Sequence, residues 1–329
     1  MLLNAFKSNR AVNYILFPFI GLLLWGRSLI HPPSYPFYIS EPENFLYSPV
    51  EKLLGLFPYL EFITGFVILI VLSFMMLYLN NRYSIVREQT MLPMSLFIIL
   101  VSGFTGMHTI HPVYPAAIFL LLAIFRLFSA FDLIKPYASA FDAGFFLGVA
   151  SLFYFSSIIL FPAFIIGIGI LSRESQWRKF VIIFIGFLLP FLFAFSYAFL
   201  SGEWLEYLKI LELNSITPSN HFKTNHSLQV YTAYLVLLLF IGSLKILQQY
   251  DTKKVSTRRY FIIFFLIFLC SVVGIIFIPA VSIEMLIISA IPLTFLITNF
   301  LIFQQNKFWR ELLFALLFIL VIAIQFFSF

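Results

Sequence analysis

The stretch that decides the fold of this chain is FVIIFIGFLLPFLFAFSYAFL, residues 180–200. It contains no charged residue, and a run of about 18–20 apolar residues is long enough to cross a bilayer as a helix. Runs of the same character recur from residue 13 to residue 329 and are separated by short polar breaks. The sequence therefore predicts an all-α, polytopic transmembrane helical bundle.

The composition of the 329 residues supports this class. Hydrophobic residues make up 62% and charged residues 10%, whereas soluble domains have about 45–50% and about 25%. No large soluble domain fits between the apolar runs, so we treat residues 1–329 as a single integral membrane domain. The net charge of +6 does not indicate nucleic-acid binding, because the basic residues lie beside the ends of apolar runs, where they orient a membrane protein.

We count about eleven spans by hydropathy. They are residues 13–30, 58–79, 91–107, 114–134, 139–155, 157–171, 180–200, 228–248, 260–280, 283–303 and 311–329.

The positive charges orient these spans. With the N-terminus in the cytoplasm, sixteen of the 20 lysines and arginines fall on the cytoplasmic side, as the positive-inside rule predicts. The C-terminus is then periplasmic. The four exceptions are Arg27, Lys52, Lys209 and Lys223.

The number of spans depends most on how residues 139–171 are divided. One long span there would move the later basic clusters to the periplasm, so we predict two short helices that meet near Ser156 and Ser157. The first carries Gly144 and Gly148, a small-xxx-small pattern that lets another helix approach closely. We favour packing within the chain over a dimer contact, and we expect Arg126 to pair with Asp142 across the preceding hairpin.

The sequence offers few signs of a cofactor. Cys270 is the one cysteine, so neither an intramolecular disulfide nor a cysteine metal cage can form. The basic N-terminus precedes an apolar run without a small-residue cleavage site, which indicates a retained first span. A P-loop, a dinucleotide fingerprint, GxSxG and HExxH are all missing, and no cofactor is expected.

The two longest loops, 31–57 and 201–227, fall on the predicted outer side. Each has a segment with apolar residues at helical spacing, Pro49–Leu60 in the first and Trp204–Leu211 in the second. We expect these segments to lie as interfacial helices that frame an outer cavity. All five histidines fall on this side as well: His31, His108, His111, His221 and His226.

These loops supply the candidate site residues. Glu41 and Glu43, with the imidazoles of His31, His108, His111 and His226, suit general acid–base chemistry. Arg27 and Lys223, together with histidines, suit a phosphate head group. A transition metal on imidazole and carboxylate is a third option, but His108 and His111 straddle a helix end beside Pro112, so we predict no metal site. Ordinary loop histidines remain the alternative.

Two resemblances follow from particular residues. The stretch from His111 to Tyr154, which includes FDAGFFLGVASLFY at 141–154, resembles an uncharacterised family of polytopic inner-membrane proteins from Gram-negative bacteria. More loosely, residues 13–200 are similar to the GT-C superfamily, multi-spanning glycosyltransferases that use polyprenyl-phosphate sugars. In that superfamily the first span leads into a long outer loop that bears a catalytic acidic residue and an interfacial helix.

The GT-C resemblance implies roles for particular residues. Glu41 and Glu43, separated by Pro42, stand where the superfamily has an Asp-Glu or Asp-Asp pair. One of them would be the general base that activates an acceptor hydroxyl. Arg27 and nearby histidines would hold the donor phosphate, and the lipid tail would lie between spans.

Two other classes stay open. Short cytoplasmic loops and the lack of a soluble domain also suit a non-catalytic subunit of an envelope or secretion complex, which would have other membrane proteins as partners. A transporter or flippase would show internal repeats, and the two halves of this chain show no convincing repeat. In every case membrane lipids are partners, among them a polyprenyl-phosphate lipid if the chain is an enzyme.

Overall fold

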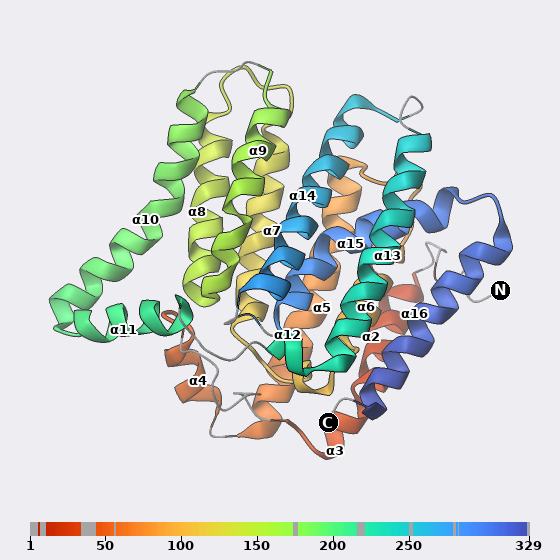
Figure 1. Cartoon of the computed structure of the whole chain (residues 1–329), viewed down its shortest axis with the longest axis horizontal. Coiled ribbons are helices and arrows are strands. Elements are labelled where there is room, and N and C mark those ends of the chain that lie inside the picture. Colours follow the sequence, from red (N-terminus) through yellow and green to blue (C-terminus); the bar gives the residue numbers. More distant parts are fainter. Residues whose placement is uncertain are drawn as a thin grey trace.

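A computed structural model describes residues 6, 11–33, 44–55, 57–173, 177–215, 221–249, 253–278, 281 and 283–327, and the elements within them are all helical (Figure 1). The α-helices are α2 Asn13–Leu24, α3 Gly26–Ile30, α4 Ser48–Leu54, α5 Pro58–Tyr83, α6 Leu92–Val101, α7 Val113–Ser129, α8 Tyr137–Phe153, α9 Phe161–Leu171, α10 Arg178–Ser201, α11 Trp204–Ser215, α12 His221–Thr224, α13 His226–Gln248, α14 Val255–Phe277, α15 Met285–Phe303 and α16 Lys307–Phe327. Two 3-10 helices accompany them, η1 Thr105–Met107 and η2 Phe155–Leu160.

Six of the described helices are long and apolar enough to cross a membrane: α5, α10, α13, α14, α15 and α16. Five shorter apolar helices of 10–17 residues join them, in residues 13–24, 92–101, 113–129, 137–153 and 155–171. Each of the eleven predicted segments overlaps one of these helices. The structure thus supports a multi-pass, all-α membrane protein, and the crossing of the membrane by the five shorter helices stays a prediction.

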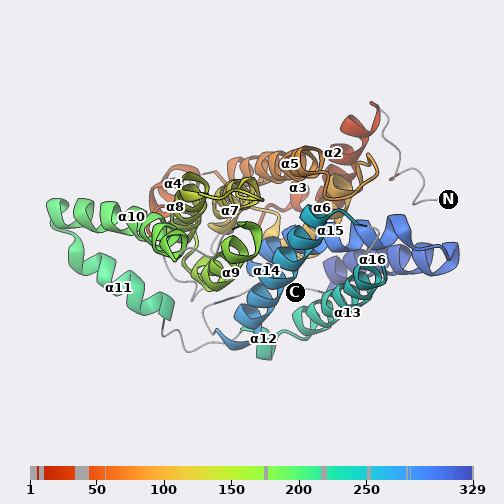
Figure 2. The ribbon, with the colours of Figure 1, turned by 90° about the horizontal axis from the view of Figure 1, so that it is seen from above.

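The helix α15 forms the centre of the bundle. It contacts α6, α7, α13 and α14, and every residue from Met285 to Ile302 is buried. A helix that is apolar on all sides is expected inside a bundle, where protein and not lipid surrounds it. In the view from above, α7–α10 lie to one side of α14 and α15, while α13 and α16 lie to the other (Figure 2).

Glycines join α8 to α10. A Cβ at Gly144 would overlap the backbone carbonyl of Ile183, and one at Gly186 would overlap the backbone of Phe141. Gly148 lies equally close to the backbone of Phe187. The helices approach this closely because small residues let their backbones meet. The predicted packing of the Gly144–Gly148 pattern within the chain is therefore confirmed.

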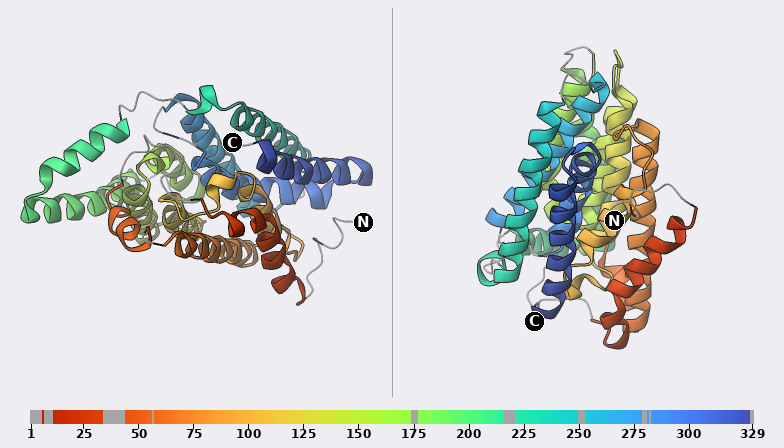
Figure 3. Two further views of the ribbon diagram at one scale, coloured as in Figure 1. Left: turned by 90° about the horizontal axis from the view of Figure 1, so that it is seen from below. Right: turned by 90° about the vertical axis from the view of Figure 1, so that its right-hand side faces the viewer.

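The bundle has two chemically different ends. At the top of Figure 1 the chain turns from α7 to α8, from α9 to α10 and from α13 to α14. We call this the basic end, because these helix ends are flanked by Lys135, Arg173, Arg178, Lys253 and Lys254. The short helices α3, α4, α11 and α12 lie at the bottom, with the last turn of α16 (Figures 1 and 3). We call this the histidine end.

Several predicted boundaries were wrong. The segment 91–107 is not one continuous helix, because α6 ends at Val101 and the chain turns at Ser102 and Gly103. The first span is interrupted at Trp25, between α2 and α3. The helix predicted at Pro49–Leu60 stops at Leu54, and Pro58 starts α5, since proline suits the first turn of a new helix.

Two other local predictions agree with the structure. Residues 139–171 fold as two helices: α8 ends at Phe153, Tyr154 adopts an extended conformation, and η2 leads into α9. Arg126 Nε lies 3.3 Å from Asp142 Oδ2, as expected for the pairing across the hairpin. Because both side chains are partly exposed, this ion pair contributes little to stability.

The close approach of α8 and α10 predicts the effect of adding a methyl group. Gly144→Ala and Gly186→Ala should each lower the unfolding free energy by about 1–3 kcal/mol, since the facing atoms are backbone and cannot move aside. Thermal unfolding of the purified protein in detergent measures this. Gly169→Ala is the control, because its Cβ would meet only the ring of Phe180 at 3.5 Å. Equal stability of all three variants would contradict the observed packing.

Candidate functional site

The connection from Ser102 to Pro112, between α6 and α7, is buried although most of it is not helical. Ser102, His108, Thr109 and His111 are all fully buried. Backbone groups without helical partners are tolerated at such depth only where protein or water satisfies them. The connection therefore depends on hydrogen bonds from other parts of the chain.

Tyrosines from three separate elements satisfy carbonyls of this region. The hydroxyl of Tyr47 donates to the Ile110 carbonyl at 2.9 Å, and that of Tyr114 donates to the Met107 carbonyl at 2.6 Å. Tyr231, on α13, donates to the Leu100 carbonyl at 2.7 Å. These bonds hold α13, α7 and the segment before α4 against the connection. We did not predict them, because the sequence offers no spacing that relates these tyrosines to residues 100–110.

His108 binds protein groups through both ring nitrogens. Its Nε2 lies 3.2 Å from the Ser102 carbonyl, which can only accept, so Nε2 carries the proton. Its Nδ1 lies 2.8 Å from Ser28 Oγ, whose hydroxyl then donates to the neutral ring. The ring also stacks on Trp25 at 4.6 Å between centroids. His108 thereby fixes α3 to the connection.

His111 forms a buried acid–base pair. Its Nε2 donates to the Gly106 carbonyl at 2.9 Å, and its Nδ1 lies 2.9 Å from Glu284 Oε1. One proton lies between Nδ1 and the carboxyl group, either on the ring with an ionised Glu284 or on a neutral Glu284. The pair is neutral overall in both cases, which keeps the cost of burial low. It fixes the start of α15 to the connection.

Arg27, on α3, is linked to the connection by a residue of α16. Its guanidinium donates to the Gln325 carbonyl at 2.9 Å, and the Gln325 amide donates to the Ser102 carbonyl at 2.6 Å. The ring of Phe326 lies 6.0 Å from the guanidinium. We define the buried polar cluster as His108, His111, Glu284, Ser28 and Gln325, arranged about the connection.

The first long loop returns to the bundle beside this cluster. Asn44 is buried, and its Oδ1 accepts a hydrogen bond from the Phe155 N–H at 3.2 Å. The Leu46 N–H donates to the Leu152 carbonyl at 3.1 Å. The ring of Phe45 lies 4.8 Å from that of Tyr207 on α11. The start of α4, the α8–η2 break and α11 therefore meet at the histidine end.

The predicted site residues divide into three groups. Glu41 and Glu43 lie outside the described residues, and so does the side chain of His221. His108 and His111 belong to the buried polar cluster, and Arg27 binds its edge. The remaining ones, His31, His226 and Lys223, are exposed; His226 Nδ1 lies 3.3 Å from Gln229 Oε1 on its own helix.

Two glutamates near the starts of the predicted spans 58–79 and 283–303 are also found here. Glu284 pairs with His111, and Glu61 Oε2 accepts a hydrogen bond of 3.4 Å from Thr109 Oγ1. Both are buried, and an ionisable residue within a hydrophobic segment is the sequence signal that marks such positions. Within the described ranges, no three His, Cys, Asp or Glu side chains converge as metal ligands would.

Long apolar helices, a fully buried central helix and buried polar residues that bind one another define the class: an integral, multi-pass membrane protein. Residues 44–329 match a family of unknown function, DUF6427, and the chain belongs to that family. No curated protein matches the chain. No solved structure matches it either.

The His111–Glu284 pair predicts a difference between two kinds of substitution. His111→Leu leaves a buried carboxyl group and the Gly106 carbonyl without their partner, and should lower the unfolding free energy by about 3–5 kcal/mol. Glu284→Gln keeps a hydrogen-bonding partner for Nδ1 and should cost much less. Thermal unfolding in detergent compares both with His226→Leu, an exposed control. A destabilisation by His226→Leu equal to that by His111→Leu would contradict the argument.

Proposed function

We propose that this protein is a GT-C-like, eleven-span inner-membrane protein that acts on a polyprenyl-phosphate-linked sugar at the periplasmic face. The observation that supports this most is the meeting of the first long loop, the α8–η2 break and α11 at the histidine end. A loop that follows the first span and returns beside later helices is the arrangement that the resemblance to the GT-C superfamily requires.

The proposed catalytic residues are Glu41 and Glu43. They directly precede Asn44, which is buried against the Phe155 backbone at this end of the bundle. A carboxylate there would accept the proton of an acceptor hydroxyl while the oxygen of that hydroxyl attacks the anomeric carbon of the donor sugar. The bond from that carbon to the phosphate oxygen breaks, and polyprenyl phosphate leaves with the electron pair.

The phosphate of the donor needs cationic partners near the membrane surface. Arg27 is exposed on α3, and His31, which is also exposed, directly follows this helix. Lys223 and His226 are also exposed at the histidine end. We assign the phosphate to this group. We assign His108 and His111 to holding the buried connection, because protein groups occupy both nitrogens of each ring.

A non-catalytic subunit of an envelope or secretion complex is the second candidate. The arm formed by the second half of α10 and the start of α11 extends away from the other helices (Figure 1), and its apolar side chains include the exposed Phe193, Phe199 and Leu200. Such an arm offers a surface for another membrane protein as well as for lipid. The enzyme proposal differs from it in requiring a reactive carboxylate.

Single changes of the two carboxylates test the enzyme proposal. Glu41→Gln or Glu43→Gln should reduce transfer of sugar to surface glycans by about 100-fold or more in cells, because a general base contributes about 10²–10⁴-fold. Glu203→Gln, an exposed carboxylate before α11, is the control. The measurement is the glycan profile of cells that lack the native gene and express one variant in its place. Unchanged glycans in both variants at normal protein levels would rule out the enzyme and favour the second candidate.

The proposed orientation has its own test. In a Cys270→Ser background, Lys209→Cys should react with a membrane-impermeant maleimide added to intact cells, and Lys254→Cys should react only after the membrane is opened. Both positions are exposed in the structure. Labelling of Lys254→Cys in intact cells would place the basic end in the periplasm and reverse the topology.

A further inference from the structure

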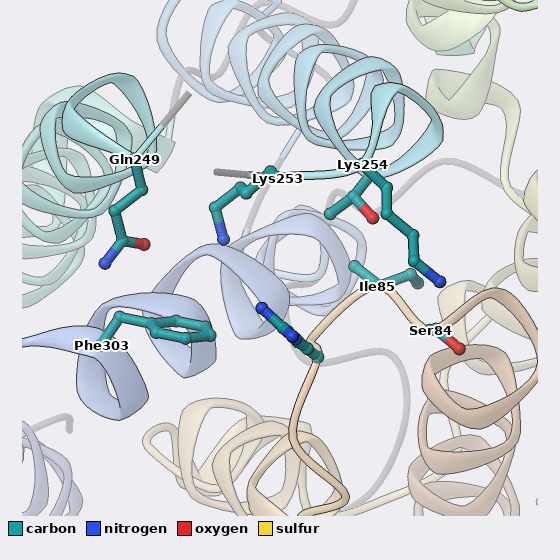
Figure 4. A pocket seen from close by; sticks show the side chains of 8 residues that line it. Ser84, Ile85, Gln249, Lys253, Lys254 and Phe303 are labelled. Atoms are coloured by element: carbon teal, nitrogen blue, oxygen red, sulfur yellow. The ribbon is translucent and has the colours of Figure 1, made fainter. Parts of the chain in front are cut away.

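A cavity of about 500 Å³ opens at the basic end, far from the buried polar cluster (Figure 4). Four elements line it: the segment after α5, the end of α13, the start of α14 and the end of α15. Its polar residues include Arg87, Lys253, Lys254, Gln249, Ser84 and Thr257. Three of these side chains carry or can carry positive charge, and the described lining includes no carboxylate. We call it the basic cavity.

The side chain of Lys253 lines the basic cavity and, unlike an exposed lysine, is held by protein groups. Its Nζ donates to Asn299 Oδ1 at 2.6 Å, lies 4.6 Å from the ring centroid of Phe303, and is partly buried. Burial lowers the pKa of the Lys253 ammonium group to about 8. The described lining offers this cation no carboxylate in place of the water that it has lost, so an anion that enters the cavity stabilises it.

The backbone around the basic cavity also favours an anion. Lys254 precedes the first turn of α14, and the N-terminus of a helix of 23 residues carries partial positive charge. On the other side, Ser84 adopts the left-handed conformation with φ of 48°. The Val86 N–H donates to Asn80 Oδ1 at 3.0 Å, which fixes the segment that presents Arg87. Glu88 faces a neighbouring cavity of about 310 Å³.

An apolar groove lies beside the basic cavity. It has a volume of about 240 Å³ and is bordered by Ile246 and Leu247 of α13, Phe261 and Phe265 of α14, and Leu296 of α15. The ring centroid of Phe261, which lines the groove, lies 5.4 Å from Nζ of Lys253, which lines the cavity, so the two lie side by side. A charged cavity beside an apolar groove matches a ligand that is charged at one end and apolar at the other.

We infer that the basic cavity and this groove together bind an acidic phospholipid, with the headgroup phosphate at Arg87, Lys253 and Lys254 and an acyl chain between α13 and α14. Basic pockets between membrane helices are suited to anionic headgroups, because the phosphate replaces the water that each ammonium group loses. The groove favours a lipid over free phosphate, since an acyl chain gains apolar contacts that an inorganic ion cannot make.

Binding of phosphatidylglycerol to the delipidated full-length protein in detergent tests this inference, with native mass spectrometry as the readout. Phosphatidylglycerol should bind about tenfold or more tightly than phosphatidylcholine of the same chain length, since basic groups near the headgroup attract its net negative charge. Lys254→Met combined with Arg87→Gln should remove this preference. Both side chains are exposed, so the variant should fold. Lys135→Met combined with Arg173→Gln removes two exposed positive charges on the same end, so it is the charge-matched control and should keep the preference.

Two further ligands distinguish the contribution of the headgroup to binding from that of the acyl chain. Glycerol phosphate and inorganic phosphate should compete weakly, because neither fills the groove. Equal binding of phosphatidylcholine, or an unchanged preference in the double variant, would overturn the inference. Competition by inorganic phosphate at concentrations similar to those of the lipid would also overturn it and indicate a simple anion site.

The pH dependence gives an independent check. Arg87 and Lys254 line the same cavity, and the described lining residues of α13 and α15, Gln249 and Phe303, are uncharged. Lys253 is charged below its pKa of about 8 and neutral above it, so the affinity for phosphatidylglycerol should fall as the pH rises through that region. Lys253→Arg should keep the affinity and remove the fall. A fall of the same size in Lys253→Arg would contradict the role of Lys253.

Discussion

The backbone between Ser102 and Pro112 needs hydrogen-bonding partners in a part of the bundle where water is scarce. An unsatisfied amide or carbonyl in such surroundings costs several kcal/mol, so each one must find a protein group. Tyr47, Tyr114 and Gln325 donate to three of its carbonyls, and the side chains of His108 and His111 donate to carbonyls within it. The two histidines in turn bind Ser28 of α3 and Glu284 at the start of α15, and Tyr231 of α13 binds the adjacent end of α6. Much of the tertiary arrangement at the histidine end follows from this requirement.

This requirement also explains why the histidines are found where they are. An imidazole can donate through one nitrogen and accept through the other, so a single ring joins two elements. His108 joins Ser28 to the Ser102 carbonyl, and His111 joins Glu284 to the Gly106 carbonyl. In a membrane bundle, where lipid is as apolar as the core, such bonds and close packing hold helices together. The main role of the two buried histidines is therefore to hold helices together.

The two ends of the bundle differ in chemistry and in the ligands they suit. At the histidine end, the members of the buried polar cluster bind other protein groups. The exposed residues of this end come from α3 and from the connections before α11 and around α12. The basic end holds lysines and arginines about a cavity whose described lining offers them no carboxylate. The proposals follow this division: a lipid-linked sugar at the histidine end and an acidic phospholipid at the basic end.

The sequence by itself determined the class, because apolar runs of bilayer length and sorted positive charges are local properties that need no partner. It also predicted the two helices in 139–171, the Arg126–Asp142 pair and the packing role of Gly144, since each depends on residues close together in the chain. Only the tertiary structure decided that α6 stops at Val101, that Glu284 meets His111, and that Lys253 lines a cavity with Arg87. The last two of these join residues more than 150 positions apart, and no periodicity in the chain encodes which of many apolar helices will pack together.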